Sequence, residues 1–325
     1  MSLFINSGSL SVPKPLPLTP MIAKATAQFQ LPPIDIATHL LANPNLTVPR
    51  EIIHGLLHPG TKGLLAGTSK VGKTWGLLDL AASVATGTPF LKWTTTQGKV
   101  LFVNLEIQRA FIKDRVQIIK ERKGLDNLDN LEVWTLRGQA LEFEEVLEEM
   151  IKRAKDRKYA VVIVDPVYKA MIGRSENTAS GVGVLCHNLE QVAVETGAAV
   201  VYCHHFTKGN QANKKAMDRM SGSGVFARDA DSIITLTEHA EENCYSVEMT
   251  LRNLPPQAPF VVQWKFPLMV VREDLDPADL KGVDRGEGNG NPDHLLAIPP
   301  GMAVPEEESS TTSPSPAATS STALP

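Results

Sequence analysis

The middle of the chain alternates short apolar runs with longer amphipathic stretches. The apolar runs lie at 63–67, 99–106, 131–136, 159–165 and 198–206. The stretches between them, at 73–85, 109–123, 143–155 and 180–195, are long enough for three or more helical turns each. Apolar runs that alternate with helices in this way are typical of strands buried on both faces. The pattern therefore predicts an α/β fold with a mostly parallel sheet sandwiched by helices.

The pattern changes after residue 206, where three β-type runs follow a polar segment. They lie at 232–238, 244–252 and 260–273, with no helical pattern between them. Consecutive strands without helical connections pair as antiparallel neighbours. We expect an antiparallel β-extension at one edge of the sheet.

The two ends of the chain differ from this central part. Residues 1–50 are rich in proline, which favours an extended arm, with a short helix at 34–41 that Asp35 could cap. Such an arm could strap two subunits together or could simply be a loose terminus. Residues 277–325 become rich in Ser, Thr, Pro and Ala, and we expect a disordered tail. The predicted organisation is therefore one domain at 51–276 between an arm and a tail.

The overall charge limits the classes of protein that the chain can belong to. Its formal net charge is −4 and its pI is about 6.1, so it lacks the basic character of a protein that coats nucleic acid. Any contact with DNA must be local. The sequence has no apolar span of membrane length and no signal-peptide pattern, and its cysteines form no C-x-x-C pair. We therefore expect a cytoplasmic protein without membrane contact.

One short motif carries the clearest chemistry. The sequence GTSKVGKT follows the first strand-like run and opens a helix-like one, and it matches G-x-x-x-x-G-K-[ST]. Its glycines permit the turn that aims backbone N–H groups at phosphate oxygens. Lys73 would reach the β- and γ-phosphates, and Thr74 would bind Mg²⁺. The predicted nucleotide-binding residues are Gly67, Thr68, Ser69, Lys70, Val71, Gly72, Lys73 and Thr74, with ATP and Mg²⁺ as cofactors.

Two carboxylates are expected at the same edge of the sheet. Asp165 ends the run at 159–165, and ligands of open α/β sheets collect where such strands end. We predict that it assists Thr74 in holding Mg²⁺. The next residue is Pro166 rather than glutamate, so the base that activates water must come from elsewhere. Glu106 ends the neighbouring run and is our candidate, although it could be an ordinary strand end facing solvent.

A histidine pair and a basic loop follow the last of the parallel strands. Strand alternation allows only one of His204 and His205 to face the nucleotide, and we favour His205 as the group that senses the γ-phosphate. The next segment carries four basic residues, which suit contacts to a DNA backbone. Those residues are Lys208, Lys214, Lys215 and Arg219.

Together these motifs resemble the RecA/DnaB superfamily of P-loop ATPases. Over roughly residues 50–272 the chain is similar to RepA-type hexameric replicative helicases of plasmids and phages. The segments that carry this similarity are IIHGLLHPGTKGLLAGTSKVGKTW, VVYCHHFTKG and MSGSGVFARDADSIITL. The resemblance implies a RecA-like core, a homo-oligomeric ring with ATP between subunits, single-stranded DNA in its channel, and replication initiators or primases as partners. It also implies an arginine finger from the neighbouring subunit, for which Arg252 matches best and Arg228 is the reserve.

The sequence thus predicts an ATP-dependent motor that translocates on single-stranded DNA. In this hypothesis the loop with the four basic residues, and a second loop at 171–178, contact the DNA. Two other functions stay open at this point. One is a RecA-like recombinase filament, and the other is a regulatory ATPase of the circadian-clock type that does not bind DNA.

Overall fold

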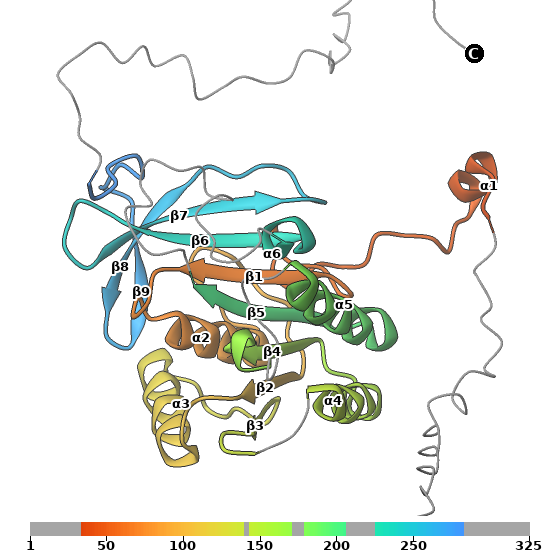
Figure 1. Cartoon of the computed structure of the whole chain (residues 1–325). Coiled ribbons are helices and arrows are strands. Elements are labelled where there is room, and N and C mark those ends of the chain that lie inside the picture. The colour runs from red at the N-terminus through yellow and green to blue at the C-terminus, as the bar shows by residue number, and fades with distance from the viewer. Residues whose placement is uncertain (1–33, 140–142, 171–178, 206–224, 283–325) are drawn as a thin grey trace, which may run out of the picture.

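The structure is a computed structural model of the whole chain, and it describes residues 34–139, 143–170, 179–205 and 225–282 (Figure 1). A nine-stranded sheet forms its centre, in the order β3-β2-β4-β5-β1-β6-β7-β8-β9. The strands are β1 (Lys62–Gly67), β2 (Val100–Asn104), β3 (Leu131–Thr135), β4 (Val161–Asp165), β5 (Ala199–His205), β6 (Ser232–Glu238), β7 (Cys244–Leu251), β8 (Phe260–Lys265) and β9 (Leu268–Arg272).

The sheet has a parallel part and an antiparallel part. Strands β1 to β6 all run in the same direction, so their carboxyl ends meet at one edge. Strands β7, β8 and β9 continue the sheet as antiparallel neighbours beyond β6. The edge where β1, β2, β4 and β5 end is therefore the place where loops from different parts of the chain come together.

Helices cover both faces of the parallel part. They are α2 (Lys73–Thr86), α3 (Arg109–Lys123), α4 (Phe143–Arg157), α5 (Ala179–Thr196) and the short α6 (Val225–Asp229), with a 3₁₀ turn η1 (Val167–Ala170) after β4. Helices α2 and α3 end at Gly87 and Gly124, whose φ angles of 72° and 62° are left-handed and favour glycine at a helix end. Helix α1 (Ala37–Ala42) has no buried residue. No helix in the described ranges is long and apolar enough to cross a membrane.

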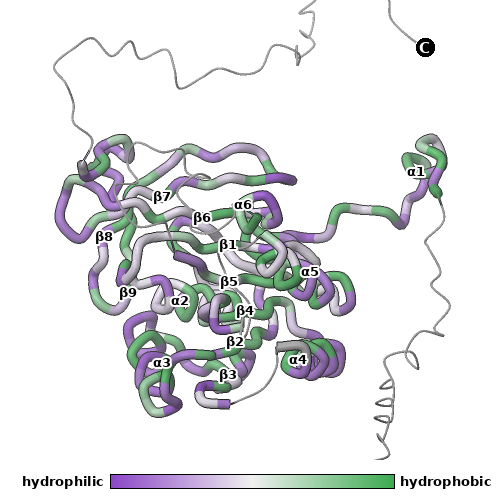
Figure 2. The backbone as a smooth tube through the Cα atoms, viewed as in Figure 1, coloured by the Kyte–Doolittle hydropathy of each residue, from purple (hydrophilic) through white to green (hydrophobic). Residues whose placement is uncertain are grey.

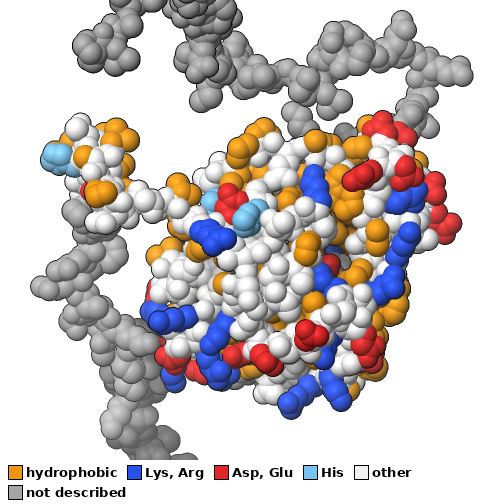
Figure 3. Space-filling model, turned by 180° about the vertical axis from the view of Figure 1, so that it is seen from behind, with side chains coloured by type: hydrophobic (Ala, Val, Ile, Leu, Met, Phe, Trp, Pro, Cys, Tyr) orange, Lys and Arg blue, Asp and Glu red, His pale blue; other side chains and the backbone are white. Residues whose placement is uncertain are grey.

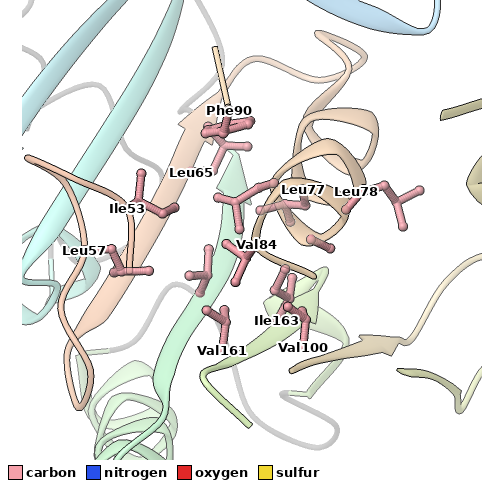
Figure 4. Packing of buried hydrophobic residues seen from close by; sticks show 14 of the residues in the cluster. Ile53, Leu57, Leu65, Leu77, Leu78, Val84, Phe90, Val100, Val161 and Ile163 are labelled. Atoms are coloured by element: carbon pink, nitrogen blue, oxygen red, sulfur yellow. The ribbon is translucent and has the colours of Figure 1, made fainter. Parts of the chain in front are cut away.

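Two apolar cores lie on opposite faces of the sheet. Helices α2 and α3 pack on one face against alternate residues of β1, β2, β4 and β5, and Figure 4 shows ten of these buried side chains by name. Helices α4 and α5 pack on the other face, with Met150 and Leu189 fully buried there. In Figure 2 the central strands are mostly green or white, whereas α4 alternates green with purple, as expected for a helix with one buried face.

The predicted fold class is confirmed, and the four helices predicted between the parallel strands are present within one or two residues at each end. The strand expected at 232–238 differs, because β6 pairs parallel to β1 and belongs to the parallel part. The run at 260–273 is not one strand but the hairpin β8–β9, which turns at Phe266 and Pro267. The helix expected at 34–41 begins at Ala37 after Ile36, so Asp35 does not cap it. Residues 277–282, which the sequence assigns to the tail, hydrogen-bond to Glu238, Ala240 and Ser246.

Candidate functional site

The loop between β1 and α2 has the backbone conformation that the motif requires. Strand β1 ends at Gly67, residues 68–72 form the turn, and Lys73 and Thr74 begin α2. Gly72 has φ 82°, in the left-handed region. A Cβ atom added to Gly72 would also lie 3.3 Å from the ring of Trp264. Both the turn and the close contact therefore favour glycine at this position.

The side chain of Lys73 is folded back into this loop. Its Nζ donates to the carbonyl oxygens of Gly67 at 2.9 Å and Thr68 at 2.7 Å. A third contact, of 3.0 Å, joins Nζ to Nδ1 of His205. Burial lowers the pKa of Lys73 to about 8, and the nearby Cys203 and Asp165 oppose this effect only in part. A phosphate anion that met this ammonium group would replace carbonyl dipoles with a full negative charge.

Asp165 lies at the end of β4 and is only 2% exposed. Its Oδ1 accepts a hydrogen bond from Cys203 Sγ at 2.8 Å, and its carboxylate also receives the hydroxyl of Thr74. Burial raises the pKa of the Asp165 carboxyl, the two hydrogen bonds oppose that rise, and the charge of Glu106 adds to it. Asp165, Thr74 and Glu106 are therefore close enough to act on one bound group.

Glu106 reaches this place from a turn rather than from a strand. Strand β2 ends at Asn104, two residues earlier than expected. The buried side chain of Asn104 fixes the turn, because it donates to the carbonyl of Ile107 at 2.7 Å and accepts from the amide of Ile107 at 2.8 Å. Glu106 is exposed at the top of this turn. Its carboxylate is thus open to solvent water while its backbone is held.

The two histidines at the end of β5 face opposite sides of the sheet. His204 is buried against Phe226 of α6, with ring centres 4.4 Å apart. His205 faces the P-loop, where its Nδ1 accepts from Lys73. Because an ammonium group can only donate, this imidazole carries its proton on Nε2. The structure therefore separates the pair, and only His205 lies in the site.

These residues line one open cavity of about 260 Å³. Its wall comprises Lys70, Gly72, Lys73, Thr74, Trp75, Glu106, Arg115, Asp165, Pro166, Cys203 and His205. The oxygen donors of Thr74 and Asp165 are of the kind that Mg²⁺ prefers, with phosphate and water oxygens completing its shell. The cavity thus has donors for phosphate, oxygen ligands for Mg²⁺ and an exposed carboxylate beside both.

Some lining residues could not be predicted from the motif alone. Trp75 and Arg115 form one wall, with the guanidinium carbon of Arg115 4.9 Å from the centre of the Trp75 ring. Trp264 and Phe266 of the β8–β9 hairpin pack beside Trp75, with ring centres 6.3 and 5.1 Å away. Cys203 lies two residues before His205 on the same strand face, so strand alternation could have indicated it.

Arg252 lies at the amino-terminal ends of the parallel strands, opposite to the carboxyl ends that carry the cavity. It follows β7, next to the start of β6, where it pairs with Asp231 at 3.2 Å and donates to the carbonyl oxygen of Arg228. The P-loop of the same chain is at the other ends of these strands. Arg252 therefore cannot reach the cavity of its own chain.

The proposed DNA-binding residues Lys208, Lys214, Lys215 and Arg219 lie outside the described residues, as does the loop at 171–178.

Comparison with known proteins identifies the type of domain. No curated protein sequence matches the chain. A family model described as an AAA domain matches residues 27–211, which is more than half of the chain. This range includes the P-loop, Glu106, Asp165 and His205. The chain therefore belongs to the AAA domain family of P-loop ATPases.

Proposed function

We propose that this protein is a ring-forming motor that hydrolyses ATP and moves on single-stranded DNA during replication. The observation that carries the proposal is the meeting of Lys73, Asp165, Glu106 and His205 around one cavity, from four different elements. Each lies at or just after the carboxyl end of a parallel strand, where α/β folds bind nucleotides.

Phosphate binding is the first step. The β- and γ-phosphates of ATP would meet the turn at 68–72 and the start of α2, whose N-terminal dipole favours an anion. Lys73 would exchange its contacts with Gly67 and Thr68 for phosphate oxygens. Thr74 and Asp165 would hold Mg²⁺, which neutralises charge on the phosphates when it is bound. The Trp75 and Arg115 wall, beyond the phosphate end, suits the base and ribose.

Hydrolysis requires a water molecule beside the γ-phosphate. Pro166 cannot supply a base, so we assign that role to Glu106, which accepts a proton as the water oxygen attacks phosphorus. The bond from phosphorus to the β,γ-bridging oxygen breaks, and the products are ADP and inorganic phosphate. The exposed carboxylate of Glu106 can then return its proton to solvent.

His205 offers a route from the nucleotide to the DNA. Its ring contacts Lys73 in the structure, so movement of Lys73 onto phosphate would release Nδ1. His205 is followed directly in sequence by the segment with Lys208, Lys214, Lys215 and Arg219. We propose that the γ-phosphate sets the position of this segment, and that these basic side chains bind the DNA backbone.

The charge on one face of the molecule fits a local DNA contact. Figure 3 shows Lys and Arg side chains mixed with Asp and Glu along the margin of that face. A mixed face does not attract a polyanion as a whole. We therefore propose that the contact is made by the basic segment after His205.

A ring would complete the site with Arg252. An arginine that stabilises charge on the transferring phosphoryl group accelerates other NTPases by roughly 10³ to 10⁵. Because Arg252 lies at the edge opposite its own P-loop, such a role requires a second copy of the chain. We propose a hexamer in which Arg252, or Arg228 as the second candidate, reaches the cavity of the neighbouring subunit.

Substitution of the basic segment tests the coupling to DNA. Lys214→Ala with Lys215→Ala should make ATP turnover the same with and without single-stranded DNA. The matched control replaces Lys152 and Lys155, two exposed lysines of α4, and should keep the stimulation. Stimulation that survives in the Lys214/Lys215 variant, or that the wild type lacks, would refute the proposed DNA coupling.

Assembly state distinguishes the proposed ring from the other two functions. A closed hexamer with ATP and Mg²⁺ supports the motor, whereas an open series of oligomers would favour a recombinase filament. Assembly without any binding of single-stranded DNA would instead favour a regulatory ATPase.

A further inference from the structure

A buried thiol lies against the carboxylate that we assign to Mg²⁺. Cys203 Sγ donates to Asp165 Oδ1 at 2.8 Å. Both side chains are almost completely buried, with exposures of 3% and 2%. A thiol is a weak donor, and its use beside a buried carboxylate therefore needs an explanation.

Packing alone does not require a thiol at this position. The residue before it on the same face of β5 is Val201, which belongs to the same apolar cluster as Cys203. A valine would fill similar space at position 203. What cysteine adds is one hydrogen-bond donor, and that donor points at Asp165.

Two neighbouring elements, strand β5 and helix α2, supply hydrogen-bond donors to the Asp165 carboxylate. Strands β4 and β5 are parallel neighbours, and Val164 pairs with Tyr202, so Asp165 and Cys203 come next in register. Asp165 also receives the hydroxyl of Thr74 from α2. The carboxylate is thus held by donors from a strand and a helix, and all three residues line the same cavity.

We propose that Cys203 is a positioning residue, which holds the Asp165 carboxylate in the orientation that binds Mg²⁺ with the nucleotide. The proposal rests on the proposed ATPase function. Groups that orient a metal ligand in this way typically contribute about 10-fold to 100-fold in metal affinity. The thiol has no role in the chemical step.

Nucleotide binding with and without Mg²⁺ provides the first test. The affinity for a fluorescent ADP is measured in full-length protein, once with Mg²⁺ and once with EDTA. Cys203→Val should weaken binding about 10-fold in Mg²⁺ and leave it unchanged in EDTA, whereas Cys203→Ser, which keeps a donor, should stay close to wild type. Equal losses in both conditions, or equal losses for Val and Ser, would overturn the proposal and indicate a packing role.

Cys186 supplies a matched control. It is also a buried thiol that hydrogen-bonds to a carboxylate, that of Asp229, but it lies in α5 on the other face of the sheet. Cys186→Val should not change the Mg²⁺ dependence of nucleotide binding. A loss as large as that of Cys203→Val would show that the effect is not local to the site.

Infrared spectroscopy tests the hydrogen bond without any nucleotide or metal. The S–H stretching band lies in a spectral window free of other protein absorption, and a hydrogen bond to carboxylate shifts it to lower frequency. The band that disappears in Cys203→Val should be a shifted one. A band at the frequency of a free thiol would refute the contact. If wild type binds no nucleotide in either condition, the proposed function fails, whereas equal binding with Mg²⁺ and EDTA overturns only the positioning role of Cys203.

Discussion

Replacement of Lys73 by methionine should make the protein more stable in the absence of nucleotide. The ammonium group is buried at 6% exposure, and burial lowers its pKa from 10.5 to about 8. At about 1.4 kcal/mol per pKa unit, this difference corresponds to a penalty of about 3 kcal/mol at neutral pH. Loss of the contacts with Gly67 and Thr68 offsets part of the gain.

The pH dependence isolates the charge from those contacts. A lysine with a lowered pKa binds fewer protons in the folded state, so its penalty is fully present below pH 8 and disappears as the pH rises through 10.5. Between about pH 7 and pH 9, roughly 1 kcal/mol of the penalty should be removed from wild type. Lys73→Met has no such group and should show no corresponding change.

The assay is urea denaturation of both proteins at a series of pH values. The quantity of interest is the free energy of unfolding of Lys73→Met minus that of wild type, because other titrating groups cancel. This difference should fall as pH rises from about 7 to 9. A difference that stays constant would refute the reasoning, since it would mean that the carbonyl contacts fully offset the burial of the charge.

Three further substitutions test one turn of the site and two buried polar groups of the fold. Gly72→Ala should destabilise the protein by about 1–2 kcal/mol in urea denaturation and weaken nucleotide binding, because Gly72 has a left-handed φ and lies against Trp264. The control Gly183→Ala, where an added Cβ meets no atom, should neither destabilise the protein nor weaken binding. Equal effects of the two substitutions would contradict this reasoning. Lys123→Met should lower the free energy of unfolding by about 3–5 kcal/mol, because it leaves the buried Asp79 carboxylate without its ion-pair partner. The control Arg153→Ala, which breaks an exposed ion pair, should lower it by about 0.5 kcal/mol or less. A similar loss of stability at both ion pairs would argue against the reasoning. Tyr202→Phe should leave stability unchanged or raise it by up to about 1 kcal/mol, because the buried hydroxyl has no hydrogen-bond partner among the described residues; a clear loss would reveal a partner.

The sequence predicted the parts of the fold that depend on local pattern. Helix α3 occupies the range expected from its spacing, and β4 ends at Asp165 as the apolar run indicated. The grouping of Thr74, Asp165 and His205 followed from one rule, that parallel strands end at the same edge. Local pattern and a general rule of topology were enough for these features.

Features that depend on distant contacts could not be predicted. Trp264 packs against Gly72, although the two residues are far apart in sequence, and no periodic signal links them. Strand β6 pairs parallel to β1, although no helical pattern precedes it to suggest a crossover. Asn104 ends β2 early because its side chain bonds to Ile107, a competition with the strand that composition does not reveal.

The most direct test of the central claim compares binding and hydrolysis of ATP in two variants. Glu106→Gln should bind ATP with Mg²⁺ as wild type does and lose its turnover, because the carboxylate is assigned only to the activation of water. Lys73→Ala should lose both binding and turnover. Turnover that persists in Glu106→Gln, or ATP binding that persists unchanged in Lys73→Ala, would contradict the assignment of this cavity as the site of ATP hydrolysis.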